Sequence, residues 1–327
     1  MPRLAAVTGG TGFLGRYVVS TLAAAGWHVR VLARKPADHP QLAGLRLETV
    51  RGDLSQGRAL RELVDGVDVV IHVAGLIKAR TAGAFQEVNV GGTVNLASAV
   101  KDRGARCRLV MVSSIAAREP QLSDYARTKR AGEEALAGVL GSRSEWLLVR
   151  PCAIYGPWDT ETLGIFRAIS RRIFLRPRVA NARVGLIHAA DAARAMAVLS
   201  ERGPAGRILE LTDERIEGYS WKDIISAAET ALRVRALCVP LPPPAVRAAA
   251  AVNLAWAWAL HRTPMLTPGK AREILHPDWG STAERQPPAG LWRPMIGLQQ
   301  GFRETVDWYR ARNWLGSANS AWLPGAP

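Results

Sequence analysis

Three side chains near the middle of the chain have types and spacing suited to proton transfer. Tyr125 and Lys129 are four positions apart in a helix-compatible run, so a helix would place the phenol and the ammonium on one face. A nearby ammonium favours the phenolate, so we expect a pKa of Tyr125 lowered from about 10 toward neutrality, as suits a general acid or base. Ser113 and Ser114 follow an apolar run at 109–112 and supply hydroxyls upstream. We expect Ser114, Tyr125 and Lys129 to be the catalytic residues.

A glycine-rich turn lies near the N-terminus, between an apolar run and a helical pattern. Residues 8–15 contain both Gly10-x-Gly12-x-x-Gly15 and Gly9-x-x-Gly12-x-x-Gly15. Glycine permits positive φ and close approach of the backbone to a pyrophosphate, which the N–H groups at a helix N-terminus can bind. The pattern predicts a dinucleotide site that includes the residues Gly9, Thr11, Gly12, Phe13, Leu14 and Gly15.

The end of the second apolar run bears on the choice of coenzyme. Dinucleotide sites that prefer NAD usually have an acidic residue there, which binds the ribose 2′-hydroxyl. This chain has Ala33, followed by the two cations Arg34 and Lys35, which suit a 2′-phosphate. We therefore expect NADP(H) to be preferred, with NAD(H) as the alternative.

The pattern of apolar runs predicts the fold. Short runs at 4–7, 28–33, 46–50, 67–73, 108–112 and 145–149 alternate with helix-length segments. This alternation indicates an α/β protein with a Rossmann-type, doubly wound parallel sheet. This alternation of apolar runs and helix-length segments ends after Pro151, although residues 207–211 suggest one more strand. A smaller, mainly helical substrate lobe is expected at the C-terminus. The predicted domains are a dinucleotide-binding domain, 1–155 with 187–215 returning to it, and a substrate-binding lobe, 156–186 and 216–327.

Taken together, residues 4–215 resemble the extended short-chain dehydrogenase/reductase family, also called the NAD-dependent epimerase/dehydratase family. Further landmarks are Gly52-Asp53-Leu54, His72-Val73-Ala74-Gly75, Asn89, Arg150-Pro151-Cys152-Ala153-Ile154-Tyr155-Gly156-Pro157 and His188-Ala189-Ala190-Asp191. The resemblance implies that Ser114 hydrogen-bonds a substrate carbonyl, Tyr125 exchanges a proton with it, and Lys129 binds the nicotinamide ribose. It also implies coenzyme contacts at Asp53, Leu54, Ala74, Gly75, Tyr125, Lys129, Pro151, Ala153 and Ile154.

Some of these residues also have a structural interpretation. A short acidic side chain after a strand often caps a turn or a helix, which we favour for Asp191 and keep as the alternative for Asp53. His72 and His188 lie at predicted strand ends, where a packed, hydrogen-bonded histidine is the commoner case. Neither histidine is assigned a catalytic role.

The substrate is less well defined than the chemistry. Eleven positions separate Ser114 from Tyr125, whereas sugar-nucleotide enzymes of the family usually have a longer loop there. The pattern is similar to bacterial reductases of the family that act on lipids, including reduction of the 3-oxo group in sphingolipid or ceramide synthesis. We therefore expect an NADPH-dependent reductase of a bulky, lipid-like ketone. The alternatives are a nucleotide-sugar epimerase or dehydratase that uses NAD, and a redox-silent dinucleotide-binding subunit or sensor.

Composition limits the possible partners. The chain has 327 residues and a formal net charge of +15, with six lysines against 37 arginines. Such a balance favours anionic partners, namely a phosphorylated cofactor or a membrane surface, although a genomic bias toward arginine would also produce it. The sequence has no basic platform with interleaved aromatic residues, which would indicate nucleic-acid binding. The three cysteines lie far apart, which argues against disulfides and against a metal site.

Two stretches of the second half bear on membrane contact. Residues 245–260 have only Arg247 and Asn253 as polar side chains and are too short to span a bilayer. They could form lobe core, line an apolar tunnel or enter a membrane interface. Residues 162–190 carry six arginines and no acid and should lie near the substrate mouth. We expect a cytoplasmic protein, with peripheral contact to the inner membrane face and pairing into a homodimer as additional possibilities.

Overall fold

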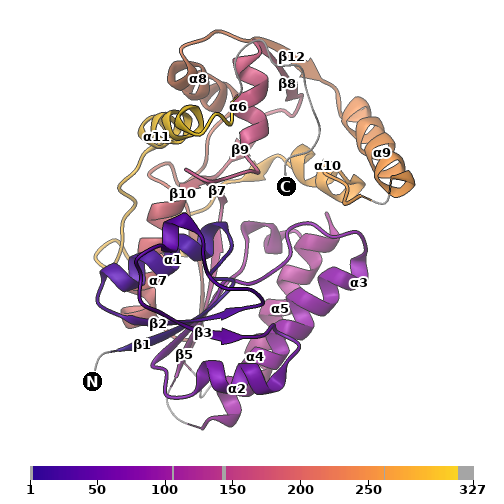
Figure 1. The fold of residues 1–327 in the computed structure, drawn as a ribbon. Coiled ribbons are helices and arrows are strands. Elements are labelled where there is room, and N and C mark those ends of the chain that lie inside the picture. Colours follow the sequence, from indigo (N-terminus) through magenta and orange to yellow (C-terminus); the bar gives the residue numbers. More distant parts are fainter. Residues whose placement is uncertain (1–2, 105–106, 142–144, 261, 316–327) are drawn as a thin grey trace.

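The sheet domain is a seven-stranded parallel sheet covered by helices, with a smaller lobe above it (Figure 1). The computed structural model describes residues 3–104, 107–141, 145–260 and 262–315. The strand order is β3-β2-β1-β4-β5-β6-β11. These strands are β1 (Leu4–Thr8), β2 (His28–Ala33), β3 (Leu47–Arg51), β4 (Val69–His72), β5 (Arg108–Val112), β6 (Trp146–Pro151) and β11 (Arg207–Leu211). The expected doubly wound sheet is confirmed, and the strand order reverses between β1 and β4, where such sheets leave a ligand crevice.

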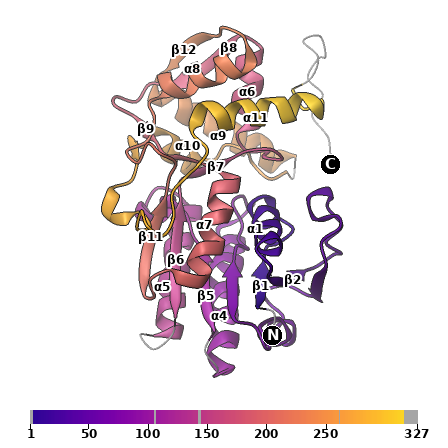
Figure 2. The same ribbon diagram turned by 90° about the vertical axis from the view of Figure 1, so that its left-hand side faces the viewer.

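Both faces of the sheet are buried, as the continuous apolar runs required. In β1, Ala5 and Val7 point into one core and Ala6 into the other. Helices α1 and α7 cover the first face, and α2, α4 and α5 cover the second (Figure 2). The flanking helices are α1 (Phe13–Ala24), η1 (Pro40–Leu42), α2 (Gly57–Val64), α3 (Ala82–Phe85), η2 (Gln86–Gly91), α4 (Gly92–Asp102), η3 (Ile115–Arg118), α5 (Asp124–Leu140) and α7 (Ala189–Arg202).

The lobe is mainly helical, as expected. Its core contains Phe166, Ile225, Phe302 and Tyr309, whose rings and methyl groups join α6, α8 and α11. Its helices are α6 (Leu163–Ser170), α8 (Trp221–Leu232), α9 (Pro243–Ala259), α10 (Pro268–Leu275), η4 (Ala283–Arg285) and α11 (Leu298–Ala311). Three parallel two-stranded pieces complete the fold: β7 (Ala153–Tyr155) with β10 (Leu186–His188), β8 (Ile173–Pro177) with β12 (Leu237–Leu241), and β9 (Arg183–Val184) with β13 (Asp278–Trp279).

The C-terminal part of the chain returns to the sheet domain before α11. Trp292 packs into the core beneath α1 and α7, and the buried Asp191 carboxylate accepts hydrogen bonds from the backbone N–H groups of Met295 and Ile296, each at 2.8 Å. The structural interpretation of Asp191 is thereby confirmed. The domain boundaries stay a prediction. The returning segment that contains Trp292 lies in the predicted lobe but packs against the sheet domain.

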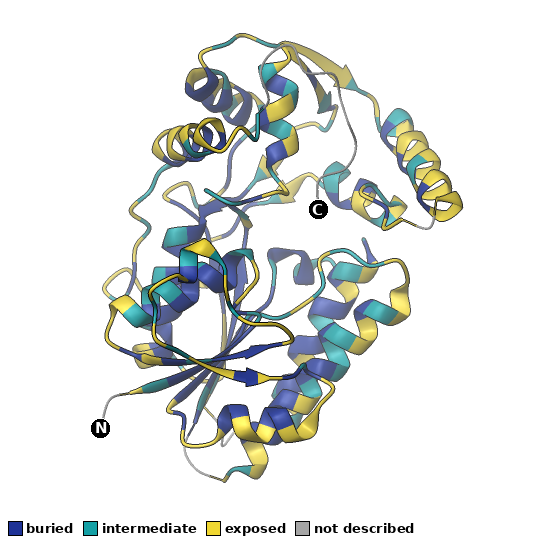
Figure 3. Ribbon diagram, in the orientation of Figure 1, coloured by how far each residue is buried: buried dark blue, intermediate teal, exposed yellow. Residues whose placement is uncertain are grey.

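Helix α9 corrects one interpretation of the sequence. Its apolar residues do not form the core of the lobe, because only Val246, Ala250 and Ala257 of the helix are buried. Trp256 and Trp258 are 65% and 80% exposed, and Figure 3 shows most of α9 in the colour of exposed residues. Among the described residues, no helix combines the length and the hydropathy needed to cross a membrane.

Candidate active site

The carboxyl ends of five sheet strands open into one large cavity. It has a volume of about 1480 Å³ and also takes in residues of the lobe. The residues that line it at the ends of β1, β2, β4, β5 and β6 are Gly9, Arg34, Val73, Val112 and Pro151, respectively. Ligand pockets for drug-sized molecules usually measure about 300–1,000 Å³. The cavity therefore has room for a dinucleotide and for part of a second bulky molecule.

The glycine-rich turn leaves the space that a pyrophosphate needs. Gly9 has a φ of +70°, and a Cβ there would lie 2.6 Å from the backbone nitrogen of Ala74. A Cβ at Gly15 would lie 1.9 Å from the carbonyl oxygen of Gly9. The first turn of α1 has no acidic residue, and no side chain caps its N–H groups. The turn and the start of α1 therefore fit the anionic centre of a dinucleotide.

Nearly all of the predicted coenzyme residues lie around this cavity. The residues in its lining are Gly9, Thr11, Gly12, Phe13, Leu14, Gly15, Arg34, Asp53, Leu54, Ala74, Gly75, Tyr125, Lys129, Pro151, Ala153 and Ile154. Lys35 is exposed and does not line the cavity. Of the two predicted cations, Arg34 is therefore the one in position to meet a ligand.

Arg34 and Asp53 are close enough to influence one another. The Asp53 carboxylate accepts hydrogen bonds from the backbone N–H and the hydroxyl of Ser55, at 2.9 and 2.6 Å. These bonds, with a smaller contribution from the Arg34 guanidinium, lower the pKa of Asp53. The capping interpretation of Asp53 is thus correct, and the same residue also faces the cavity.

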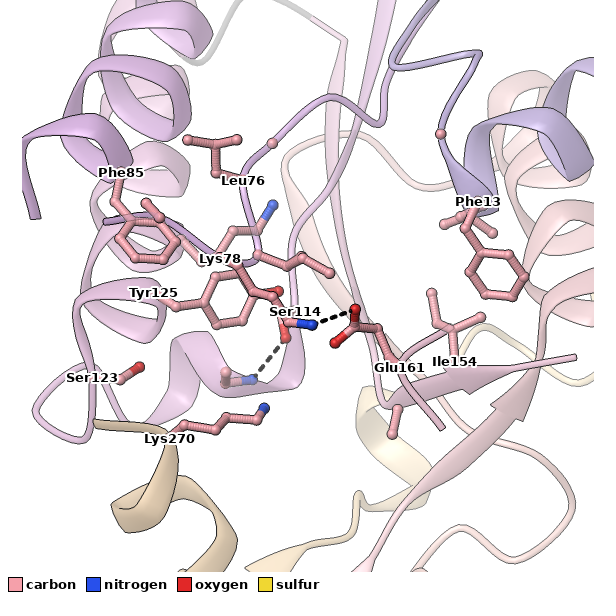
Figure 4. A pocket seen from close by; sticks show the side chains of 18 of the residues that line it. Phe13, Leu76, Lys78, Phe85, Ser114, Ser123, Tyr125, Ile154, Glu161 and Lys270 are labelled. Carbon is pink, nitrogen blue, oxygen red and sulfur yellow. Dashed lines mark hydrogen bonds and ion pairs between the residues drawn. The ribbon is translucent and has the colours of Figure 1, made fainter. Parts of the chain in front are cut away.

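Ser114 and Tyr125 lie together in the cavity wall, as Figure 4 shows, with Phe13 and Ile154 on the opposite side. Ser114 precedes η3, and its hydroxyl accepts a hydrogen bond from the Ala116 N–H at 3.2 Å. Tyr125 lies in the first turn of α5, and its ring centroid is 6.3 Å from that of Phe85. The structure therefore brings a serine hydroxyl and a phenol to the same wall.

The pKa of Tyr125 departs from the sequence-based prediction. Burial of the phenol raises it to about 12, although the hydrogen bond with Ser114 opposes this change and Glu273 adds to it. The expected lowering by Lys129 is wrong for this arrangement. The Lys129 ammonium donates to the Val112 carbonyl at 2.8 Å, so its charge is engaged by the end of β5. Tyr125 therefore holds its proton at neutral pH, which suits a general acid.

Lys129 is nevertheless well placed for a role in ligand binding. It is buried in α5 and lines the cavity, and a Cβ on Gly75 would lie 3.7 Å from its Nζ. Desolvation lowers its pKa to about 8, against the attraction of Glu133. Its ammonium group thus lies beside the turn after β4, at the wall of the cavity.

Asn89 joins that turn to helix α5. Its Oδ1 accepts from the Leu76 N–H at 2.7 Å, and its Nδ2 donates to the Leu76 carbonyl and the Thr128 hydroxyl at 3.0 and 3.2 Å. A Cβ on Gly132 of α5 would lie only 2.6 Å from the Asn89 carbonyl oxygen. The sequence marked Asn89 as a landmark, and the structure gives it a positioning role.

Several charged residues of the cavity were not predicted from the sequence. Lys78 and Glu161 form an ion pair at 2.7 Å between the two parts of the molecule (Figure 4). Lys270 and Glu273 of α10 also line the cavity, and Glu273 accepts a short hydrogen bond from the hydroxyl of Ser123, the cap of α5. These residues are far apart in the sequence, so no local pattern could have identified them.

The arginine-rich stretch 162–190 contacts the cavity through its apolar side chains. Its apolar residues Ile165, Phe166 and Leu186 line the cavity, whereas its six arginines do not. Most of these arginines are exposed, which places their charge on the outside of the lobe. The stretch therefore lies at the cavity, as expected, but through its apolar residues and not through its arginines.

The histidines are structural. His72 is hydrogen-bonded on both ring nitrogens, to Thr8 Oγ1 at 2.6 Å and Thr93 Oγ1 at 3.0 Å, and burial lowers its pKa to about 3. His188 caps the start of α7, and burial also lowers its pKa. The packed, hydrogen-bonded state predicted for both is confirmed.

The chain belongs to the NAD dependent epimerase/dehydratase family, whose model matches residues 5–211. It is thus an NAD(P)-dependent oxidoreductase of the extended short-chain dehydrogenase/reductase type. The resemblance noted from the motifs is confirmed.

Two reductases and one solved structure are similar to this chain. The chain is 45% identical over 310 residues to a ceramide reductase of Caulobacter vibrioides, covering 95% of each protein. It is 32% identical over 225 residues to a 4-hydroxy-2-methyl-3-oxo-4-farnesyl-3,4-dihydroquinoline-1-oxide ketoreductase of Stigmatella aurantiaca, covering 63% of this chain and 67% of that one. The NAD complex of UDP-glucose 4-epimerase from Thermus thermophilus has the same fold, with a TM-score of 0.68, 22% identity and coverage of 94% and 99%.

Proposed function

We propose that this protein is an NADPH-dependent reductase of a ketone on a bulky hydrophobic, lipid-like substrate, with a 3-oxo-sphingolipid or 3-oxo-ceramide as the first candidate. The observation that carries the proposal is the apolar wall that the lobe adds to the cavity containing Ser114 and Tyr125. The side chains of this wall are Phe166, Trp221, Leu254, Met265, Trp279 and Phe302. Apolar and aromatic linings suit acyl chains better than a hydrophilic sugar nucleotide. The two reductase relatives support the same substrate class.

The residues of the cavity suit carbonyl reduction. A bound reduced nicotinamide coenzyme would supply a hydride to the carbonyl carbon. The Ser114 hydroxyl would donate a hydrogen bond to the carbonyl oxygen, where negative charge develops as the π electrons move onto it. Tyr125 holds its proton at neutral pH and would transfer it from Oη to that oxygen, which gives the alcohol. The buried ammonium of Lys129 would hold the coenzyme ribose and stabilise the phenolate left behind.

The preference for NADPH rests on the end of β2. Ala33 replaces the acidic residue typical of NAD sites, and Arg34 lines the cavity beside Asp53 and Leu54. A guanidinium there would bind a 2′-phosphate through charge-assisted hydrogen bonds. Arg34→Ala should raise the KM for NADPH by about tenfold or more and leave that for NADH within about twofold. Arg58→Ala, an exposed arginine of α2 outside the cavity lining, is the control and should change neither.

The direct test is coenzyme oxidation by the purified protein with a long-chain 3-oxo-sphingoid base or 3-oxo-ceramide in detergent, with NADPH and NADH run in parallel. Turnover that is faster with NADPH supports both parts of the proposal. Turnover with equal efficiency for NADH would remove the coenzyme part. If neither coenzyme is oxidised although one binds, the lipid-ketone function is wrong. A tightly held NAD released on denaturation would then favour the sugar-nucleotide alternative.

Pairing into a homodimer is a separate proposal, since dimers are common in this family. Light scattering of the purified protein tests it, and a monomeric mass at assay concentration would contradict it.

A further inference from the structure

Helix α9 exposes apolar surface to an unusual degree. The exposed fractions are 58% for Val252, 65% for Trp256 and 80% for Trp258, and Leu260, which follows the last residue of the helix, is 54% exposed. Arg247 is the one charged side chain among its 17 residues. Large exposed apolar surfaces usually mark a site of interaction with another molecule or with a membrane. Figure 1 places α9 at the outer edge of the lobe, with α10 beside it.

The side chains around α9 are arranged as expected for a helix that lies in a membrane interface. Its inner stripe consists of Val246, Ala250, Asn253 and Ala257, and the Asn253 side chain accepts a hydrogen bond from the Leu266 N–H at 2.9 Å. At about 100° per residue, the opposite side is a ridge of alanines, flanked by Trp256 on one side and Trp258 on the other. Tryptophan rings are typical of the boundary between headgroups and acyl chains.

The charge around α9 suits an anionic surface. Residues 230–272, which contain α9, have no aspartate or glutamate, and neither have residues 162–190. The pairing of β8 with β12 brings these two acid-free stretches together. This ribbon also exposes apolar side chains, among them Ile173 at 55% and Leu237 at 67%. Arginines thus accompany the apolar surface without acidic side chains from either stretch, which favours contact with anionic lipid.

The end of α9 leads directly to the active site. Leu254 and Met265 line the cavity, and the Met265 sulfur lies 3.4 Å from the Lys78 ammonium. The following helix, α10, is attached to the loop before Tyr125, where Arg272 donates to the Leu122 carbonyl at 2.7 Å. A molecule that leaves a membrane beside α9 would therefore meet the apolar wall of the cavity first.

We propose that α9 and the β8–β12 ribbon form a docking surface for a bilayer that carries anionic headgroups, and that the lipid substrate reaches the cavity past Leu254 and Met265. The alanine ridge and the two tryptophans enter the headgroup region. Arg247 binds the anionic headgroups, together with Arg176 of the ribbon and the exposed Arg172 and Arg178 on either side of β8. The delivery step rests on the proposed reductase function, whereas docking itself does not.

The test is sedimentation of the full chain with vesicles of phosphatidylcholine, alone or mixed with phosphatidylglycerol. We expect binding to the mixed vesicles that weakens with added salt. The double variant Trp256→Glu/Trp258→Glu should lower the vesicle partition coefficient by at least about tenfold, since it places charge on the inserted face. Arg247→Gln should lower it by about fivefold. The matched controls Met295→Glu, at a residue 74% exposed in the sheet domain, and Arg58→Gln should leave binding unchanged.

Activity separates docking from catalysis. The double variant should retain turnover of a detergent-solubilised ketone and lose turnover of the same ketone in mixed vesicles. Absence of vesicle binding by the wild-type chain would overturn the docking proposal and leave the reductase untouched. Failure of all ketone turnover, with vesicle binding intact, would overturn the reductase and the delivery step alone. If the double variant instead converts a larger oligomer to a smaller one in light scattering, a second copy of the chain covers α9 and the bilayer proposal is wrong.

Discussion

Helices α5 and α9 have the same length of 17 residues but opposite relations between composition and burial. Helix α5 carries many charges, yet it buries seven residues, including Lys129 and Glu133. Helix α9 is almost wholly apolar and buries three. Hydrophobicity alone therefore did not decide which helix entered the core. The positions of the two helices differ: α5 packs on one face of the sheet with its first turns at the cavity, whereas α9 lies at the edge of the lobe (Figures 1 and 3).

The buried charges of α5 are compensated by specific partners. Glu133 accepts two hydrogen bonds from the Arg150 guanidinium, at 2.8 and 2.5 Å, and Lys129 donates to the Val112 carbonyl. A buried charge with such partners is tolerated, whereas one that loses its partner is strongly destabilising. The exposed face of α9 has no comparable constraint within the lobe. Substitutions should thus act on catalysis and stability in α5, and on association in α9.

The largest effect is expected on catalysis. Tyr125→Phe removes the proposed proton donor while leaving the ring beside Phe85. We expect turnover to fall by about 10²–10⁴-fold with coenzyme affinity almost unchanged, as is typical of the loss of a general acid. Steady-state kinetics and coenzyme titration measure both. Wild-type turnover in this variant would remove Tyr125 from its assigned role.

The next largest effect is expected on stability, at the buried ion pair between Glu133 of α5 and Arg150. Glu133→Ala leaves the Arg150 charge buried without its partner and should lower the free energy of unfolding by about 3–5 kcal/mol. The neighbouring Glu134, which pairs with Arg130 at 2.7 Å on the surface, provides the matched control. Glu134→Ala should change stability by about 0.5 kcal/mol or less. Urea unfolding of both variants tests the difference, and equal effects would contradict it.

Two glycines of α5 test the close contact with Asn89. Gly132→Ala should destabilise the protein by about 1–3 kcal/mol, because its Cβ would lie 2.6 Å from the Asn89 carbonyl oxygen. Gly138 has no atom within 4 Å of such a Cβ. Gly138→Ala should therefore stabilise the helix by about 0.5–1 kcal/mol. Unfolding changes of the same sign for the two variants would contradict this arrangement.

The buried Lys129 makes stability depend on pH. Its folded pKa of about 8 is below the usual 10.5, so between these values the unfolded chain binds a proton that the folded chain has released. Stability should therefore rise as the pH increases from about 8 toward 10.5, by at most about 1.4 kcal/mol per pH unit. Lys129→Met lacks this contribution. The difference between wild-type and variant unfolding free energies should thus change between pH 8 and pH 10, and a constant difference would contradict the lowered pKa.

The smallest effect on stability is expected in α9. Trp258→Ser removes a side chain that is 80% exposed, so the free energy of unfolding should change by about 0.5 kcal/mol or less. Leu136→Ala, at a fully buried position of α5, should cost about 2–5 kcal/mol. A large loss of stability in Trp258→Ser would show that α9 belongs to the folded core after all.

The sheet and its ligand side could be predicted because their signals are local. Apolar runs buried on both faces define the strands, and the turn at 8–15 defines where a dinucleotide would bind. The burial of Tyr125, and hence its raised pKa, could not be predicted, since part of its environment comes from Glu273 of α10. Nor could the ion pair between Lys78 and Glu161, which are 83 positions apart.

The sequence by itself determined the parallel sheet, the glycine-rich turn and the order of Ser114, Tyr125 and Lys129. Each depends on the period of apolar residues or on spacing within one element. Only the tertiary structure decided that Lys129 is bonded to the end of β5 and that the apolar α9 remains on the surface. The physical reason is that burial and pKa depend on which distant elements pack around a residue, and that packing is settled by the whole fold.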